Sequence, residues 1–212
     1  MEISNFEEIH SRRDFNSYLI KFDNLFDLES DIMSHIIVET IVVYQPFPTI
    51  IKEVSNFITN YVLEIKREDI VEKYQLEPFE MLIQSVERTF IDKIFAICDY
   101  HLNGTYDRYS RHLYDIYMIW NSSMLDKKLL VEIIPNVISD RQRFEERNLS
   151  CKKGSSPIEI LLDVLRSEVY RYDYLNITSK LIYNSVSYEE CVDTMHEIIA
   201  SGIIPDVIID SP

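Results

Sequence analysis

The stretch from Ser85 to Trp120, SVERTFIDKIFAICDYHLNGTYDRYSRHLYDIYMIW, decides the fold because its apolar residues recur at helical spacing on both sides of a polar break. Ser85 is a residue type that caps helix starts, and Asn103-Gly104 closes the first helix with a residue that readily adopts positive φ. A short connection of this kind favours an antiparallel helix pair. The apolar stripes are Phe90, Ile94 and Ile97 in the first helix, then Leu113, Ile116, Tyr117 and Trp120 in the second.

Downstream of this pair the pattern stays helical, and four or five helices are expected from Val86 to the end. Residues 206–212 are expected to fray, as chain ends commonly do. Upstream, the pattern is that of a sheet. We therefore predict an α+β fold with a sheet subdomain over residues 1–84 and a helical subdomain over residues 85–212.

The sheet prediction rests on three segments. Period-two alternation around Tyr18 predicts one strand, and the apolar run from His35 to Tyr44 predicts a second. Phe79–Ile83 predicts a third, short strand. Between them, the apolar spacing over Thr49–Glu64 favours a helix capped by Thr49, although β-branched residues are frequent there.

Composition places the chain among folded proteins of the cytoplasm. Hydrophobic residues make up 46% and charged residues 27%, which is too apolar for disorder. No run approaches the roughly 20 apolar residues of a membrane span, and the acidic N-terminus does not resemble a secretory signal. The three scattered cysteines, Cys98, Cys151 and Cys191, indicate buried free thiols rather than a disulfide framework or a zinc site.

The net charge of the chain restricts which partners it can bind. The formal net charge of −15 opposes general attraction to nucleic acid, so such a partner would need a local basic patch or bridging metal ions. With three glycines and no glycine-rich phosphate motif, P-loop and dinucleotide chemistries are excluded. A further cluster of basic residues is interspersed with acidic residues, which is typical of a solvated helix face. The alternative is a basic patch that binds the phosphate backbone of a nucleic acid. Its members are Arg141, Arg143, Arg147, Lys152 and Lys153.

Glu39 is the first candidate site residue, since it interrupts an apolar strand on the same face as Ile37 and Ile41. An ionised carboxylate buried there costs several kcal/mol unless it is paired or binds a cation. One interpretation is structural: an ion pair, or an edge strand open to water. The other is a metal-binding or catalytic carboxylate.

The second candidate is a cluster of charges on the helix pair. Arg88 and Lys93 from the first helix can approach residues of the second helix, and several cations around one carboxylate suit a triphosphate or a nucleic-acid backbone. The alternative is structural, because Arg111 and Asp115 are spaced for an ordinary salt bridge along one helix. His112 is equally compatible with a hydrogen-bonded histidine at a surface or interface.

These motifs resemble a known family. VERTFIDK (residues 86–93) and SRHLYD (residues 110–115) are similar to the helical part of AbiEii/AbiGii-type nucleotidyltransferase toxins, which resemble polymerase-β-like nucleotidyltransferases. The likeness extends upstream to IIVE (residues 36–39), PFP (residues 46–48) and SRRDFN (residues 11–16). The resemblance implies a partial nucleotidyltransferase-like sheet followed by a helical bundle.

The resemblance also implies roles. Glu39 would be the third active-site carboxylate and a metal ligand, Lys93 a phosphate-contacting cation, and Asp115 the acid that faces it. The same cleft would be lined by Arg88, Arg111 and His112. The implied cofactor is Mg²⁺, and the implied partners are a nucleoside triphosphate, an acceptor that is RNA (tRNA included) or protein, and an antitoxin.

One family element is not found in this sequence: the Gly-Gly or Gly-Ser turn followed by Asp-x-Asp, which holds the metal for attack on a nucleotide α-phosphate. The acids in Asp27–Asp31 have no such turn before them and are interpreted as a loop. Glu39 alone would hold a divalent cation weakly, so the expectation is an incomplete enzyme. The alternatives are a non-catalytic module that binds an antitoxin or a separate catalytic fragment, and a domain whose charges are all structural.

Overall fold

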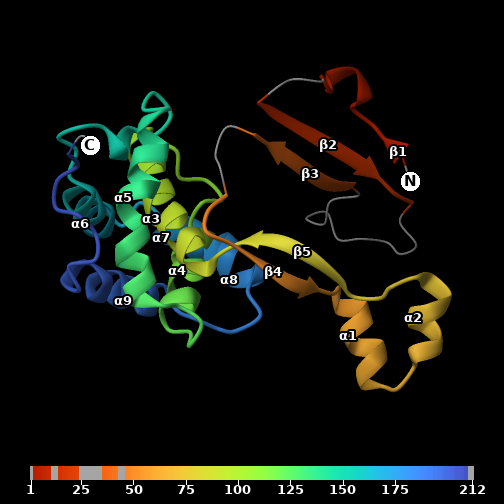
Figure 1. Ribbon diagram of the computed structural model, residues 1–212. Helices are drawn as coiled ribbons and strands as arrows, with labels where there is room; N and C mark the ends of the chain where they lie inside the picture. Colours follow the sequence, from red (N-terminus) through yellow and green to blue (C-terminus); the bar gives the residue numbers. More distant parts are fainter. Residues whose placement is uncertain (1, 11–13, 24–34, 43–45, 210–212) are drawn as a thin grey trace. The chain divides into compact units, whose positions relative to one another are not determined.

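The computed structural model of the chain describes residues 2–10, 14–23, 35–42 and 46–209 (Figure 1). Its strands form two small sheets and its helices follow mainly after residue 85, which confirms the α+β class. The chain divides into two compact units, residues 1–45 and residues 46–212. Residues 46–84 therefore belong to the same unit as the helices, and the boundary at residue 84 between a sheet subdomain and a helical subdomain stays a prediction.

The first unit is a three-stranded antiparallel sheet in the order β1-β2-β3. Both strands expected between Phe15 and Tyr44 are confirmed, up to the residues that the structure describes. Buried Asn5 joins the start of the chain to the middle strand: its side chain donates to Ser17 O (2.8 Å) and accepts from Leu19 N (2.9 Å). The strands are β1 (Glu2–Ile3), β2 (Phe15–Lys21) and β3 (His35–Ile41), with a 3₁₀ turn at Phe6–Glu8.

The second unit begins with an antiparallel pair of strands, β4 (Thr49–Val54) and β5 (Phe79–Gln84). Two short helices, α1 (Phe57–Glu64) and α2 (Glu68–Tyr74), connect them. The helix expected to start at Thr49 is therefore wrong over its first half. Its β-branched residues favour a strand once β5 offers backbone partners, and the helix starts only after Asn56, whose side chain accepts from Thr59 N at 2.8 Å.

The remainder of the second unit is helical and centres on α3 (Val86–Leu102). Ser85 caps this helix as expected, and Gly104 ends it with φ +66°. Among the described residues five helices of ten or more residues follow residue 85, in agreement with the four or five expected. The others are α4 (Arg111–Trp120), α5 (Lys127–Gln142), α6 (Pro157–Ser167) and α9 (Tyr188–Ala200), with short α7 (Arg171–Asp173), a π-helical turn at Tyr174–Thr178, and α8 (Ser179–Leu181).

Helix α3 packs against α4, α5 and α6, so the core surrounds it. The three cysteines are buried free thiols, as expected. The C-terminal segment is held rather than frayed as far as residue 209: Ile208 is 2% exposed and exchanges backbone hydrogen bonds with Gly154 and Ser155. Residues 210–212 lie outside the described residues.

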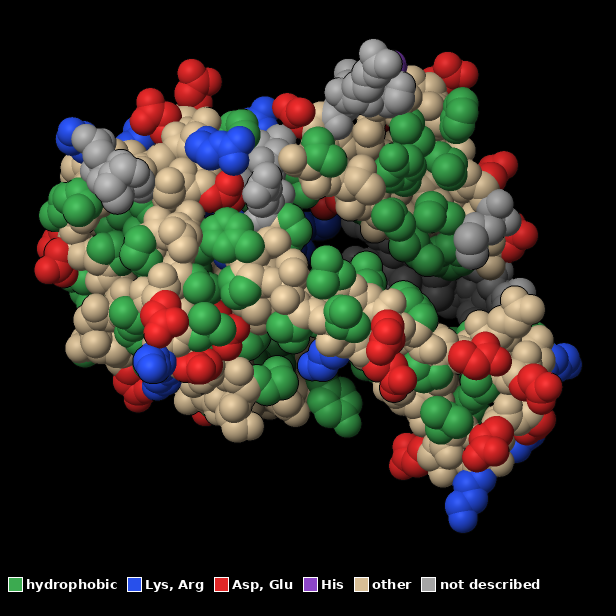
Figure 2. All heavy atoms as spheres, viewed as in Figure 1, with side chains coloured by type: hydrophobic (Ala, Val, Ile, Leu, Met, Phe, Trp, Pro, Cys, Tyr) green, Lys and Arg blue, Asp and Glu red, His purple; other side chains and the backbone are tan. Residues whose placement is uncertain are grey.

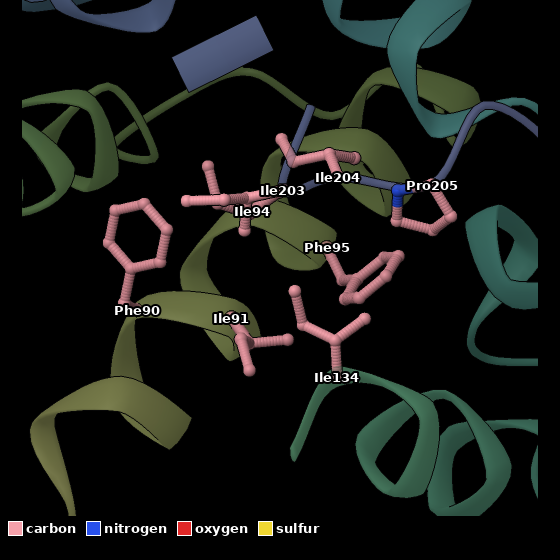
Figure 3. A pocket seen from close by; sticks show the side chains of 8 residues that line it. All are labelled: Phe90, Ile91, Ile94, Phe95, Ile134, Ile203, Ile204 and Pro205. Carbon is pink, nitrogen blue, oxygen red and sulfur yellow. The ribbon is translucent and has the colours of Figure 1, made fainter. Parts of the chain in front are cut away.

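A small hollow in the core, about 10 Å³ in volume, lies among α3, α5 and residues 203–205 (Figure 3). It is roughly the space of one water molecule, and its lining is apolar, so it offers no polar partner to hold one. The hollow therefore belongs to the packing of the core. Its lining residues are Phe90, Ile91, Ile94, Phe95, Ile134, Ile203, Ile204 and Pro205.

Candidate functional site

Helix α3 carries charged residues on two different sides. Arg88, Asp92 and Asp99 are spaced by four and seven residues and share one side of the helix. Lys93 follows Arg88 by five residues, or about 140° of rotation, and points to a different neighbour. The structure shows that the first side meets α5 and that Lys93 meets α4.

The central contact of the second side joins Lys93 to Asp115. Lys93 Nζ donates to Asp115 Oδ2 at 2.6 Å, and the two side chains remain 23% and 35% exposed. The expected contact between these residues is thereby confirmed, while their roles stay predictions. An ammonium group has three donors, and Asp115 occupies one of them. Solvent access leaves the remaining donors open to a ligand.

His112 lies one turn before Asp115 on α4. Its Nδ1 is 3.9 Å from Asp115 Oδ2, and within the described segments that buried nitrogen has no hydrogen-bond partner. Burial, followed by the nearby charges of Lys93 and Arg111, lowers the pKa of His112 to about 4, against the opposing effect of Asp115. His112 is therefore neutral near pH 7, and any contact with a phosphate would be a hydrogen bond rather than a charge pair.

Arg111 opens α4 and its side chain is exposed. The ordinary Arg111–Asp115 salt bridge that the spacing allowed is not among the ion pairs of the described residues, because Asp115 pairs with Lys93 instead. Arg111 is still close enough to act on the pKa of His112. With Lys93 and Arg111 positive, Asp115 negative and His112 neutral, this site carries local positive charge in a chain whose net charge is −15.

Two tyrosines adjoin this site that the sequence did not single out. The rings of Tyr100 and Tyr109 stack with centroids 3.7 Å apart, and the His112 ring lies 5.8 Å from Tyr100 in a nearly parallel plane. Burial, and then Tyr109, raise the pKa of Tyr100. A signal for Tyr100 was present, since it follows Lys93 by two helical turns and so shares its side of α3.

Arg88 faces α5 rather than α4, in contrast to its expected place beside Asp115. It is 1% exposed, donates to Asp92 (3.0 Å) and Asp140 (3.1 Å), and covers the ring of Phe47 at 4.6 Å. A guanidinium this buried is compensated by carboxylates and is closed to solvent. The structure therefore separates Arg88 from the Lys93–Asp115 pair.

Arg141 is a second departure from expectation, because it is buried rather than part of a solvated helix face. It donates to Asp99 (2.6 Å) and Asp92 (3.3 Å), and Asp99 also accepts from Ser150 N at 2.8 Å. Burial acts to lower the pKa of Arg141, but Cys151 and the two carboxylates outweigh it and the pKa is raised. The matching acids were visible in the spacing of Asp92 and Asp99 on α3.

Glu39 lies on β3 in the first unit, directly across from Ser17 of β2. Its side chain is exposed, and β3 is an edge strand whose neighbouring positions Ile37 and Ile41 are about half exposed. This is the structural alternative of an edge position open to water, so Glu39 needs no buried partner. Its expected opening toward the Lys93 cleft stays a prediction.

A divalent metal needs several oxygen ligands close together. Within residues 2–10, 14–23, 35–42 and 46–209, no group of three or more histidine, cysteine or acidic side chains is arranged to hold one. Asp115 is occupied by Lys93, and Glu39 is single on its strand. The described residues thus do not form a complete Mg²⁺ site by themselves.

The fold and the site define a mixed α+β protein with an accessible lysine–aspartate pair and additional positive charge, a type of site suited to phosphate-bearing ligands. A comparison with family models matches residues 2–194 to the family described as nucleotidyl transferase AbiEii toxin, type IV TA system. The chain belongs to this family. Comparisons with curated proteins and with solved structures found no match. No helix in the described part of the chain has the length and apolar character to cross a membrane.

Proposed function

We propose that this chain binds the phosphates of a nucleoside triphosphate through Lys93, as part of a nucleotidyltransferase toxin that modifies an RNA, tRNA included, or a protein. The observation that carries the proposal is the partly exposed Lys93–Asp115 pair at 2.6 Å, beside exposed Arg111. The pair unites the two motifs on which the family likeness rests. Membership of the family supports the nucleotidyl transfer and an antitoxin as partner.

Each residue has a distinct role in this proposal. Lys93 neutralises phosphate oxygens with the donors that Asp115 leaves open, and Asp115 fixes the ammonium group in place. Arg111 adds a second cation at the rim. Because His112 is neutral near pH 7, it orients a phosphate or hydroxyl group by a hydrogen bond. Arg88 is assigned to the packing of α3 against α5 instead.

We further propose that the metal ligands come in large part from outside the described residues. Glu39, as the third carboxylate, would contribute one oxygen ligand and bind Mg²⁺ weakly by itself. The remaining carboxylates would then be supplied from outside the described residues, and nucleotidyl transfer would require them. Nucleotide binding by Lys93 does not require these additional carboxylates, so it can be measured on this chain alone.

The alternative function is a non-catalytic interaction module. It is favoured by apolar side chains that are exposed on both faces of the β4–β5 pair, and Figure 2 shows hydrophobic side chains on the face that is in view. Two strands alone are marginally stable, and exposed apolar side chains often bind other proteins. Ile51 and Leu82 lie on one face, and Ile50, Phe79 and Met81 lie on the other. In this case the partner would be an antitoxin or a separate catalytic fragment.

The test is incubation of the purified chain with α-³²P-labelled nucleoside triphosphates, Mg²⁺ and total RNA, together with equilibrium dialysis of the same nucleotides. Lys93→Ala is the test variant, and Lys128→Ala, an exposed lysine on α5, is the matched control. Labelled RNA that disappears only with Lys93→Ala would show a complete site. Binding without labelling, again lost only with Lys93→Ala, would support the partner-dependent form. Nucleotide binding that is absent, or that survives Lys93→Ala, would contradict the proposal.

A further inference from the structure

The start of α4 lacks a side-chain cap of its own. Ser110 occupies the N-cap position, yet its side chain makes no capping bond to the helix. Its hydroxyl is instead 2.7 Å from Thr178 Oγ1, in the π-helical turn, and both residues are buried. Two donors of its first turn are satisfied locally, since His112 N donates to Tyr109 O and Leu113 N donates to Ser110 O, both at 3.0 Å.

Just ahead of this turn, two backbone N–H groups donate to Asp173 of α7. One carboxylate oxygen accepts from Arg108 N at 2.9 Å, and the other accepts from Ser110 N at 3.1 Å. Asp173 is 5% exposed, so this carboxylate sits inside the protein against the positive end of the α4 dipole. Arg108 has φ +67°, a conformation that non-glycine residues rarely adopt, and the bond from its N–H holds it there.

We propose that Asp173 is a positioning residue for the Lys93 site: by clamping the start of α4, it sets the orientation in which His112 and Asp115 face Lys93. Arg111 and His112 follow the clamped Ser110 directly, and Asp115 lies little more than one turn further. A small rotation of α4 would move Asp115 away from Lys93 Nζ, which it contacts at 2.6 Å. The functional consequence for nucleotide binding rests on the proposed function above.

The experiment compares Asp173→Ala and Asp173→Asn with Asp126→Ala. Asp126 is the matched control, because its carboxylate likewise accepts from two backbone N–H groups at a helix start, those of Lys128 and Leu129 in α5. Asn keeps one acceptor oxygen, so its effect should be intermediate, and it provides a second variant if Asp173→Ala does not fold. Two quantities are measured: the His112 pKa by NMR titration, which needs no nucleotide, and the dissociation constant for ATP.

We expect Asp173→Ala to move the His112 pKa from about 4 toward 6.5, as the ring loses its buried position beside Lys93. ATP binding should weaken on the order of tenfold. Asp126→Ala should leave both quantities unchanged even though it removes a cap. Unchanged His112 titration in both Asp173 variants would overturn the proposal. A shifted His112 pKa in a chain whose wild type binds no ATP would instead uphold the clamp and contradict only the proposed function.

Discussion

The two charged sides of α3 use the same residue types under opposite conditions. Toward α5, Arg88 and Arg141 are buried and paired with Asp92, Asp99 and Asp140. Toward α4, one lysine pairs with one aspartate in a partly exposed position, with an exposed arginine nearby. On the α5 side the guanidinium groups are paired with carboxylates. On the α4 side the Lys93 ammonium group keeps N–H donors available to a ligand.

The difference shows that the solvent exposure of a cationic side chain indicates whether it has a structural or a ligand-binding role. Residue type alone does not distinguish these two roles. Removing one partner of a buried ion pair leaves an uncompensated charge, so the α5 side should govern stability. A partly exposed pair such as Lys93–Asp115 contributes less to stability than a buried one. The α4 side should therefore govern binding, and substitutions on the two sides should have effects of different kinds.

The largest effect on stability is expected from Arg141→Met, which leaves the buried carboxylate of Asp99 without its guanidinium. We expect the free energy of unfolding to fall by about 3–5 kcal/mol, measured by urea denaturation. Arg143→Met is the control, since that guanidinium is 59% exposed and lies 3.5 Å from Asp140. It should change stability by no more than about 0.5 kcal/mol. Equal losses of unfolding free energy in the two variants would contradict the distinction between buried and exposed ion pairs.

A smaller effect should appear as the pH is lowered, because the pKa of His112 is about 4 in the folded chain and 6.5 as its ordinary value. The fold favours the neutral ring, so this contribution is fully present above pH 6.5 and is lost as the pH falls to about 4. Its upper bound is about 3 kcal/mol. We expect His112→Gln to lose less stability than the wild type between pH 7 and pH 4 in urea denaturation. Parallel pH profiles would contradict the buried, neutral histidine.

Lys93→Met should cost little stability, about 1 kcal/mol or less, because the pair with Asp115 is partly exposed. The same substitution removes a charge that lowers the His112 pKa, so that pKa should rise. Thermal unfolding and NMR titration measure the two effects. A loss as large as that of Arg141→Met would mean that both sides of α3 are structural.

The smallest effect is expected from Glu39→Gln. This side chain is exposed on edge strand β3, so the free energy of unfolding should change by no more than about 0.5 kcal/mol. If Glu39 is the third active-site carboxylate, weak Mg²⁺ binding measured by calorimetry should be lost while the fold is kept. A clear loss of stability would indicate a structural ion pair instead.

The sequence predicted elements whose signals are local. The α3–α4 pair follows from apolar spacing, the Ser85 cap and Gly104, and strand β5 follows from a short run of strand-forming residues. The segment at Thr49 was predicted incorrectly because its conformation depends on pairing with β5, some 30 residues further along the chain. Periodicity within the segment does not contain that information.

In the candidate site, too, contacts between neighbouring elements were predictable from the sequence and contacts between distant segments were not. Lys93 and Asp115 lie in motifs on adjacent antiparallel helices, and their contact followed from that arrangement. The spacing of Asp92 and Asp99 on α3 indicated acids on one side of that helix. Their pairing with Arg141, and the contacts of Asp173, depend on packing between segments more than 40 residues apart, which local patterns do not show. Helical spacing on α3 could have separated Arg88 from Lys93, because about 140° of rotation lies between them.

The most direct test is the dissociation constant of ATP for Lys93→Met and Lys128→Met, each compared with the wild type after its unfolding temperature has been measured. We predict that Lys93→Met weakens ATP binding at least about tenfold at nearly unchanged stability, and that Lys128→Met binds ATP as the wild type does. Wild-type affinity in a folded Lys93→Met chain would contradict the assignment of the exposed side of α3 to nucleotide binding.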